Sequence, residues 1–359
     1  MTTRRDVLMG GAGLAACSVL PALAAPLPPQ SSLPQSPLGV AQTALGHYFR
    51  KMNGGQPRRG PADPFATVDY VRSLGGGGLQ MALAPDTDVK KLRARLEKNN
   101  MFFEGDIRLI AKPGDDTAEF EAGLRMFKAL GAACVRTVSF VGRRYETFSS
   151  LQQYKDWKAN ADGVLAACVP IADKVGIALA MENHKDRVID EEVDGLKKYS
   201  SEYFGALVDF GNNISMCDDP VEVIRKLAPY AKATHVKNMA VAPYDQGFLL
   251  SEVPMGQGIL DLKRMVAAVL KARPSAKFSL DMLTRDPLKI TCLTEKYWLT
   301  FPERNGKYLA RALAMVRKNK PAKPLPRVTG LDKEAQLRME LDNINQCVAY
   351  ARDHLGLRA

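Results

Sequence analysis

Histidine is scarce in this sequence. Only four occur among 359 residues, at His47, His184, His235 and His354, and two of them lie near the ends of the chain. Multinuclear zinc sites draw on many nitrogen ligands, so four scattered histidines argue against a trinuclear site.

Paired cysteines are also missing. Five cysteines follow residue 24, an odd number, and no two of them have CxxC spacing. This pattern argues against a disulfide framework and against a thiolate metal site. We interpret these five as small core residues: Cys134, Cys168, Cys217, Cys292 and Cys347.

A concentrated basic segment is absent, although the formal net charge is +11. The Lys and Arg residues are spread along expected helices and tails, without the clustered basic stripe and interleaved aromatics of a nucleic-acid binder. We therefore expect solvated helix faces and no nucleic-acid partner. The apolar fraction of 46% and charged fraction of 25% are those of a globular protein.

No apolar run is long enough for a comfortable membrane span, so we expect no stable transmembrane segment. The longest apolar stretch, Val7 to Leu20, follows the pair Arg4-Arg5 and precedes the small residues before Ala25. Residues 1–24 thus have the pattern of a twin-arginine signal peptide, with residues 25–36 as a leader, and predict export to the periplasm. A lipoprotein anchor at Cys17 is a minor alternative.

From residue 37 onward, short β-branched runs alternate with longer segments of helical period, which is typical of a parallel sheet covered by helices. The eight expected strands are Leu38–Ala44, Gly78–Leu83, Met101–Leu109, Ala133–Phe140, Ile177–Glu182, Gly205–Asp209, Ala233–Val236 and Lys277–Met282. The expected helices between them include Val89–Lys98, Phe120–Leu130, Tyr154–Val175, Pro220–Tyr230 and Leu260–Ala272. Eight such units predict an α/β fold, a (β/α)₈ TIM barrel over residues 37–317.

The rest of the chain, residues 318–359, is a C-terminal extension. Lys318–Gly330 is rich in Pro and Lys and indicates an extended connection. Beyond it, Leu337, Leu341, Ile344, Val348, Ala351 and Leu355 form one apolar stripe on an expected final helix. The stripe must be buried against the barrel or against a second subunit, so the sequence leaves open whether the protein forms a homo-oligomer.

Active sites of TIM barrels lie at the C-terminal ends of the strands, where four runs of this sequence end in polar residues. The fifth run ends in Glu182, the sixth in Asp209 and the eighth near Asp281, while His235 lies near the end of the seventh. Three carboxylates crowded together repel one another unless a cation lies between them. The set therefore predicts a divalent-metal site that favours Mn²⁺ and also suits Mg²⁺, Co²⁺ or Zn²⁺.

At this point the sequence resembles the xylose isomerase-like barrels of the sugar phosphate isomerase/epimerase group, over about residues 37 to 316. The resemblance is carried by Glu182-Asn183-His184, Asp209-Phe210-Gly211-Asn212, Asp218-Asp219-Pro220, Leu227-Ala228-Pro229-Tyr230 and His235-Val236-Lys237. It implies that Glu182, Asp209 and His235 are metal ligands, with Asp281 where the family usually has Glu. That shorter side chain is a departure from the family pattern.

The resemblance implies an enzyme that moves a proton next to a carbonyl through an enediolate, with Glu182 and Asp281 as the catalytic pair. Six further residues are candidates for binding the carbohydrate substrate: His184, Lys237, Arg136, Glu104, Asp106 and Arg285. A strand-end Arg or Glu serves equally well as an ion-pair partner.

These features predict an isomerase or epimerase acting on a free or keto sugar, because sugar phosphates are scarce outside the cytoplasm. A metal-dependent hydratase or lyase on 3-keto-sugar derivatives begins with the same proton abstraction and is the second enzyme hypothesis. A periplasmic sugar-binding barrel without turnover is the non-enzymatic alternative. The endonuclease IV-like phosphodiesterases of the same superfamily need more histidines than this chain has.

Overall fold

The structure is a computed structural model that describes residues 37–54 and 60–358. The expected signal peptide with its Arg4-Arg5 pair and Cys17, and the leader that follows, lie outside the described residues. Within the described ranges, no helix combines the length and hydropathy required to cross a membrane.

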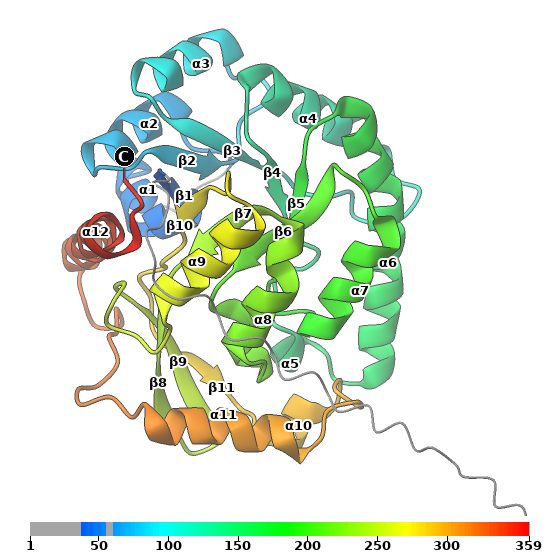
Figure 1. Cartoon of the computed structure of the whole chain (residues 1–359), viewed down its shortest axis with the longest axis vertical. Helices are drawn as coiled ribbons and strands as arrows, with labels where there is room; N and C mark the ends of the chain where they lie inside the picture. Colours follow the sequence, from blue (N-terminus) through cyan, green and yellow to red (C-terminus); the bar gives the residue numbers. More distant parts are fainter. Residues whose placement is uncertain (1–36, 55–59, 359) are drawn as a thin grey trace, which may run out of the picture.

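Eight parallel strands close into a barrel in the order β1-β10-β7-β6-β5-β4-β3-β2 (Figure 1). They are β1 (Leu38–Ala41), β2 (Gly78–Met81), β3 (Phe102–Asp106), β4 (Val135–Thr137), β5 (Leu179–Glu182), β6 (Phe204–Asp209), β7 (Ala231–Val236) and β10 (Phe278–Leu280). All eight expected strands are present, which confirms the (β/α)₈ barrel.

Some expected strand ends are wrong. The first run was expected to continue to Ala44, but Gln42–Leu45 forms a 3₁₀ helix in which Ala44 and Leu45 are buried. Burial in a turn leaves the same apolar pattern as burial in a strand, so the pattern alone misplaces this end. β2, β3, β4 and β10 also end two or three residues before their expected ends.

Helices surround the barrel (Figure 1). They are α1 (Gly46–Met52), α2 (Pro64–Ser73), α3 (Val89–Lys98), α4 (Ala118–Leu130), α5 (Arg144–Thr147), α6 (Leu151–Val175), α7 (Ile189–Tyr199), α8 (Pro220–Leu227), α9 (Leu262–Ala272), α10 (Glu295–Trp298), α11 (Gly306–Lys318) and α12 (Lys333–Tyr350). Asp219 caps α8 by accepting from the backbone N–H groups of Val221 and Glu222. Gly131 and Gly176 end α4 and α6 with φ of 84° and 71°, which glycine adopts without strain.

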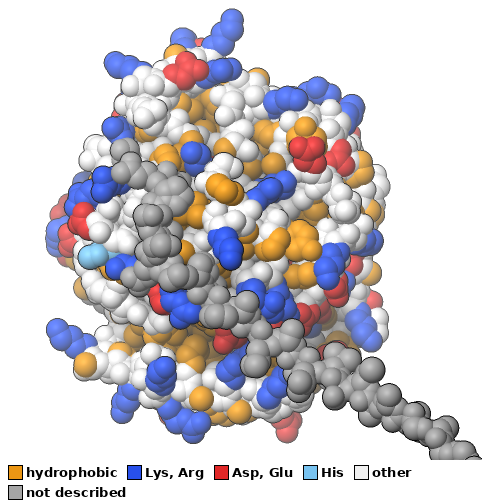
Figure 2. Space-filling view, viewed as in Figure 1, with side chains coloured by type: hydrophobic (Ala, Val, Ile, Leu, Met, Phe, Trp, Pro, Cys, Tyr) orange, Lys and Arg blue, Asp and Glu red, His pale blue; other side chains and the backbone are white. Residues whose placement is uncertain are grey.

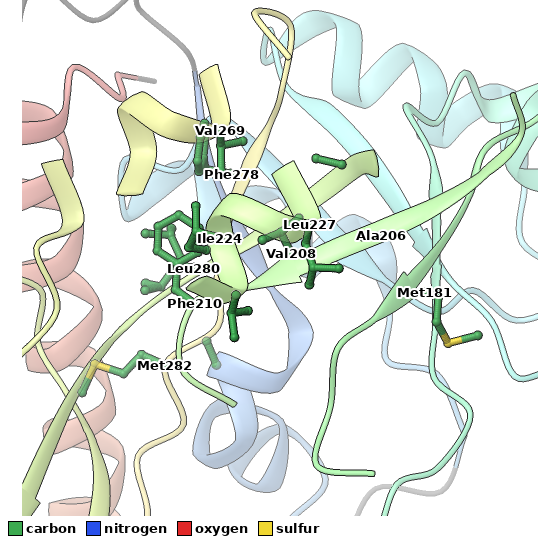
Figure 3. Packing of buried hydrophobic residues seen from close by; sticks show 14 of the residues in the cluster. Met181, Ala206, Val208, Phe210, Ile224, Leu227, Val269, Phe278, Leu280 and Met282 are labelled. Carbon is green, nitrogen blue, oxygen red and sulfur yellow. The ribbon is translucent and has the colours of Figure 1, made fainter. Parts of the chain in front are cut away.

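The strands that carry the polar ends are held in place by an apolar cluster between barrel and helices. Figure 3 shows Ile224 and Leu227 of α8 and Val269 of α9 gathered with Val208 of β6 and Phe278 of β10. All five side chains are buried. Close packing of this kind fixes strand positions to within fractions of an ångström, which a multi-ligand site requires.

A second, antiparallel sheet was not anticipated from the sequence. It has the order β11-β9-β8 and consists of β8 (Asn238–Tyr244), β9 (Gly247–Val253) and β11 (Leu288–Ile290). Only Lys237 separates β7 from β8, so the sheet rises directly from the C-terminal rim of the barrel. Figure 1 shows it beside α11, which contacts β8 and β9.

Part of the C-terminal stripe is buried against this chain. Helix α12 packs on α1 and continues into a π-helical turn over Ala351–Leu355. Ile344, Cys347, Ala351 and Leu355 are buried. Three of the six stripe residues, Ile344, Ala351 and Leu355, are thus covered within this chain, while Leu337, Leu341 and Val348 are partly exposed.

One buried acid connects this extension to the start of the barrel. The two carboxylate oxygens of Glu340 on α12 accept hydrogen bonds from the backbone N–H groups of His47 and Tyr48, at 2.7 and 2.8 Å. These groups belong to the first turn of α1, where N–H groups lack helical partners.

We expect Glu340→Ala to lower the free energy of unfolding by about 1–3 kcal/mol, because it removes two hydrogen bonds to backbone N–H groups at a helix start. Denaturant unfolding followed by circular dichroism measures this loss. Asp342→Ala, an exposed position on the same helix, is the matched control and should change stability by less than about 0.5 kcal/mol. Equal effects of the two substitutions would contradict the docking role.

On the face seen in Figure 2, Lys and Arg side chains are dispersed among acidic and apolar ones. They do not merge into one basic area on that face. The absence of a nucleic-acid partner stays a prediction.

Candidate metal centre

Four ligand-type residues meet at the C-terminal rim of neighbouring strands. Glu182 ends β5, Asp209 ends β6, His235 lies one residue before the end of β7, and Asp281 directly follows β10. The strand register places Asp209 opposite His235, and the backbone N–H of Asp281 donates to the carbonyl of Val236. Parallel pairing in this register therefore brings the four side chains together.

The ligand atoms of these four buried residues all lie within 4.8 Å of one another. The Nδ1 atom of His235 is 3.8 Å from Glu182 Oε1, 3.6 Å from Asp209 Oδ2 and 3.5 Å from Asp281 Oδ2. Three carboxylate oxygens thus surround one imidazole nitrogen. The arrangement can hold a small cation.

A glutamine fixes the orientation of the His235 ring by contacting Nε2, the ring nitrogen that does not face the carboxylates. Its Nε2 atom lies 2.7 Å from Gln80 Oε1, while Gln80 Nε2 donates to Glu104 Oε2 at 2.8 Å. Because the Gln80 amide donates to Glu104, its oxygen must accept from His235, and Nε2 carries the hydrogen. Nδ1 has no hydrogen-bond partner. A buried, unpartnered nitrogen directed at three carboxylates is the arrangement expected of a metal ligand.

Each carboxylate is also held in a set orientation. Asp209 Oδ1 accepts from the backbone N–H groups of Gly211 and Asn212, which turns Oδ2 toward His235. Glu182 accepts from Asn212 at Oε1 and from Arg136 at Oε2, the latter at 2.5 and 2.8 Å. Asp281 accepts from Thr43 at Oδ1 and from Lys237 at Oδ2.

These contacts keep the carboxylates ionised. Burial by itself raises the pKa of Glu182, but Arg136 and His235 outweigh it and hold that pKa well below its usual range. Burial also raises the pKa values of Asp209 and Asp281, but the charge of Lys237 outweighs it, so both pKa values are lowered. Three negative charges therefore persist at neutral pH, as a cation site requires.

The donor set fits a divalent metal ion. Three carboxylates and one imidazole are a hard, oxygen-rich set that suits Mn²⁺, Mg²⁺, Co²⁺ or Zn²⁺. The unpartnered Nδ1 of His235 supports the fit. Lys237 is the complicating neighbour, because its ammonium lies 2.7 Å from Asp209 Oδ2 and 2.6 Å from Asp281 Oδ2.

The ammonium of Lys237 thus already contacts two of the expected ligand oxygens. A bound dication must either displace this ammonium or share the two oxygens with it. We expect Lys237→Met to bind a divalent metal at least about tenfold more tightly. The metal-free variant should lose about 3–5 kcal/mol of stability, because a buried charge pair is broken.

Chelator-competition titration and denaturant unfolding of the metal-free protein measure the two effects. Lys232→Met is the matched control, since this lysine lies on β7, the strand that Lys237 directly follows, and donates to the backbone carbonyl of Glu202 instead. A Lys237→Met variant with unchanged metal affinity would show that the ammonium does not oppose the cation.

The structure brings most of the other sequence candidates to the same rim. Arg136 pairs with Asp106 as well as with Glu182, and both Arg136 and Asp106 are partly exposed. His184 is partly exposed, its Nδ1 has no partner, and burial and the nearby Lys185 lower its pKa to about 3.

Two candidates are differently placed from the expectation. Arg285 makes a two-point ion pair with Glu252 of β9, so its guanidinium joins the second sheet to the rim. Glu104 and Asp106 lie two residues apart on β3, so both point into the barrel. Glu104 lies one layer deeper than Asp106. It reaches His235 only through Gln80 and therefore does not line a substrate wall.

Three polar residues at the site were missed by sequence reasoning. Gln80 was hidden because it lies inside an apolar strand, and Asn212 because turns commonly contain asparagine. Lys185 was overlooked because surface lysines are common, yet it is buried in the loop after β5. The one signal that the sequence offered was Gln80 itself, a polar residue within an otherwise apolar strand.

Comparison with known proteins gives a family and a set of similar folds. The profile of the xylose isomerase-like TIM barrel family matches residues 68–318. The uncharacterized protein YihM of Escherichia coli K12 is 24% identical over 95 residues, which are 26% of this chain and 29% of that protein. The matched part therefore spans less than a third of that relative.

Among solved structures, D-psicose 3-epimerase in the presence of D-fructose matches with a TM-score of 0.55 and 14% identity, covering 89% of this chain and 99% of that one. L-ribulose 3-epimerase matches with a TM-score of 0.54 and 14% identity, covering 90% and 95%. The IOLI protein with a binding zinc atom has a TM-score of 0.51 and 15% identity, covering 79% and 99%. At these identities the likeness establishes the fold.

Proposed function

Because the chain belongs to the xylose isomerase-like TIM barrel family, we propose that it is a divalent-metal-dependent sugar isomerase or epimerase. The observation that carries the proposal is the convergence of Glu182, Asp209, His235 and Asp281 within 4.8 Å. The sugar epimerases among the similar folds support a small carbohydrate as substrate. We propose Mn²⁺ as the preferred ion, with Mg²⁺, Co²⁺ and Zn²⁺ as substitutes.

When bound, a divalent cation supplies a Lewis acid that polarises a sugar carbonyl and its neighbouring hydroxyl. The remaining work is proton transfer at the carbon between these two groups. Glu182 and Asp281 are ionised, so either can accept a proton, and two strands of the barrel order separate β5 from β10. One carboxylate on each side allows removal of a proton from one face and return to either face.

The chain keeps both carboxylates in fixed positions. Arg136 binds Glu182 through two nitrogens, and Lys237 and Thr43 bind Asp281. Held groups need little reorganisation during proton transfer, which lowers its barrier. Asp281 is one methylene shorter than the glutamate usual in the family, so the substrate must approach β10 more closely.

The experiment that tests this proposal is solvent exchange. Metal-loaded protein is incubated in D₂O with a panel of free sugars and keto sugars, and deuterium at the carbon next to the carbonyl is followed by NMR. We expect exchange with at least one of them, and none after chelation of the metal. Saturable sugar binding without any exchange would instead support a binding barrel without turnover.

We also propose that the protein works outside the cytoplasm. The support is the twin-arginine pattern at Arg4-Arg5 and the small residues before Ala25. A periplasmic enzyme meets few sugar phosphates, so a free or keto sugar is the proposed substrate.

A further inference from the structure

One lysine at the rim has no carboxylate partner. Lys185 is buried in the loop that follows β5, and its ammonium donates one hydrogen bond, to Asn212 Oδ1 at 2.5 Å. An ammonium has three donors, so two remain for another group. Among the described residues, no carboxylate oxygen lies within ion-pair distance of it.

This distinguishes Lys185 from the other cations of the site. Each of these has a carboxylate oxygen at 2.5–2.6 Å: Arg136 with Glu182, Lys237 with Asp281, and Arg285 with Glu252. A buried cation without a partner costs several kcal/mol. Burial, followed by the repulsion of Lys237, accordingly lowers the pKa of Lys185 to about 8.

Lys185 is linked directly to the proposed chemistry. Asn212 receives the Lys185 hydrogen bond at its oxygen and donates through Nδ2 to Glu182 Oε1 at 2.9 Å. Two hydrogen bonds therefore separate the ammonium from a ligand and base. His184, the preceding residue, leaves its buried Nδ1 without a partner.

We propose that Lys185 binds an oxyanion of the substrate beside the metal centre. This inference rests on the proposed function and adds a substrate property to it. The shared chemistry is a negatively charged oxygen, supplied either by a permanent carboxylate of a sugar acid or by the enediolate that forms during proton transfer. In both cases the two free donors of Lys185 take up the charge.

Calorimetry on the metal-loaded protein tests the first source. The ligands are two matched pairs, 2-keto-D-gluconate with D-fructose and D-glucuronate with D-glucose, in which only a carboxylate differs. For a permanent carboxylate, we expect one acid to bind at least about tenfold more tightly than its neutral partner. Lys185→Met should remove this preference, Lys185→Arg should retain part of it, and Lys232→Met should leave it unchanged.

Deuterium exchange tests the second source. If the enediolate is the anion, Lys185→Met should lower the exchange rate about 100-fold or more while sugar affinity stays the same. Metal stoichiometry and circular dichroism show whether each variant is folded and loaded. A folded, loaded Lys185→Met that alters neither carboxylate preference nor exchange overturns the inference.

Absence of exchange in the unmodified protein counts instead against the proposed isomerase or epimerase. The calorimetric comparison still decides the role of Lys185 in that case, because it does not depend on turnover.

Discussion

Replacing Glu182 by Gln is expected to lower the rate of proton exchange about 10²–10⁴-fold, the usual contribution of a positioned base. The amide cannot accept the proton, and it offers the metal a neutral oxygen in place of a charged one. Metal affinity should therefore fall about tenfold or more. Exchange kinetics and chelator competition measure the two losses separately.

The substitution also removes one of the two carboxylate partners of Arg136. Arg136 would keep Asp106 but lose the carboxylate that accepts two of its nitrogens. Part of the loss could therefore be one of stability, which unfolding experiments on the same variant detect. Glu340→Gln, a buried glutamate of α12, is the control that should leave exchange and metal stoichiometry unchanged. Full activity of Glu182→Gln would remove the residue from the mechanism.

Metal affinity is expected to increase about tenfold per pH unit below about pH 10, or about 100-fold from pH 6 to pH 8. In the metal-free protein, burial lowers the pKa of His235, but the carboxylates of Asp281 and Glu182 outweigh it and raise this pKa to about 10. A cation must take Nδ1, so binding releases one proton. Acid therefore opposes binding.

The same shift predicts the stability of the metal-free protein. A raised pKa means that protonated His235 contributes stability that is fully present below about pH 6.5, the unfolded value. This contribution disappears as the pH rises through about 10. The metal-loaded protein should not show that decline, so the difference in stability between the two forms should widen with pH.

Isothermal titration in buffers of different ionisation enthalpy measures the proton released. His354→Gln, a change at an exposed histidine, should keep the pH dependence, whereas His235→Gln should abolish it. A metal affinity that does not vary between pH 6 and pH 8 would mean that binding releases no proton from His235, which would contradict the raised pKa of this histidine in the metal-free protein.

The sequence located the four candidate ligands because their signal is positional. A carboxylate or imidazole that ends an apolar run in a (β/α)₈ pattern must lie at the C-terminal rim. Glu182, Asp209 and Asp281 satisfied this rule directly, and His235 did so one residue before its strand end. The eight strands followed from periodicity in the same way.

Two kinds of feature could not be foreseen from the sequence: how deep a side chain lies in the barrel, and which distant segment lies next to it. Glu104 and Asp106 share the alternation of one strand, so sequence could not tell that only Asp106 lies near the opening. The isolation of Lys185 depends on the absence of a carboxylate that any distant segment could have supplied. The hairpin β8–β9 was missed because it begins only one residue after β7, without a separating turn.

The partner of the C-terminal stripe was equally beyond the sequence. Apolar spacing on α12 shows that a face is buried but not by what. The decisive contact, Glu340 on the backbone of His47 and Tyr48, joins residues almost 300 positions apart. Only the folded chain reveals it.

The central claim is that Glu182, Asp209, His235 and Asp281 hold one divalent cation. Anomalous diffraction from crystals of protein purified without added metal, combined with elemental analysis of the same preparation, tests it most directly. We predict about one equivalent of metal per chain and an anomalous peak between His235 Nδ1 and the three carboxylates. A folded protein that exchanges substrate protons at full rate with no peak there, or with its metal elsewhere, would contradict the account.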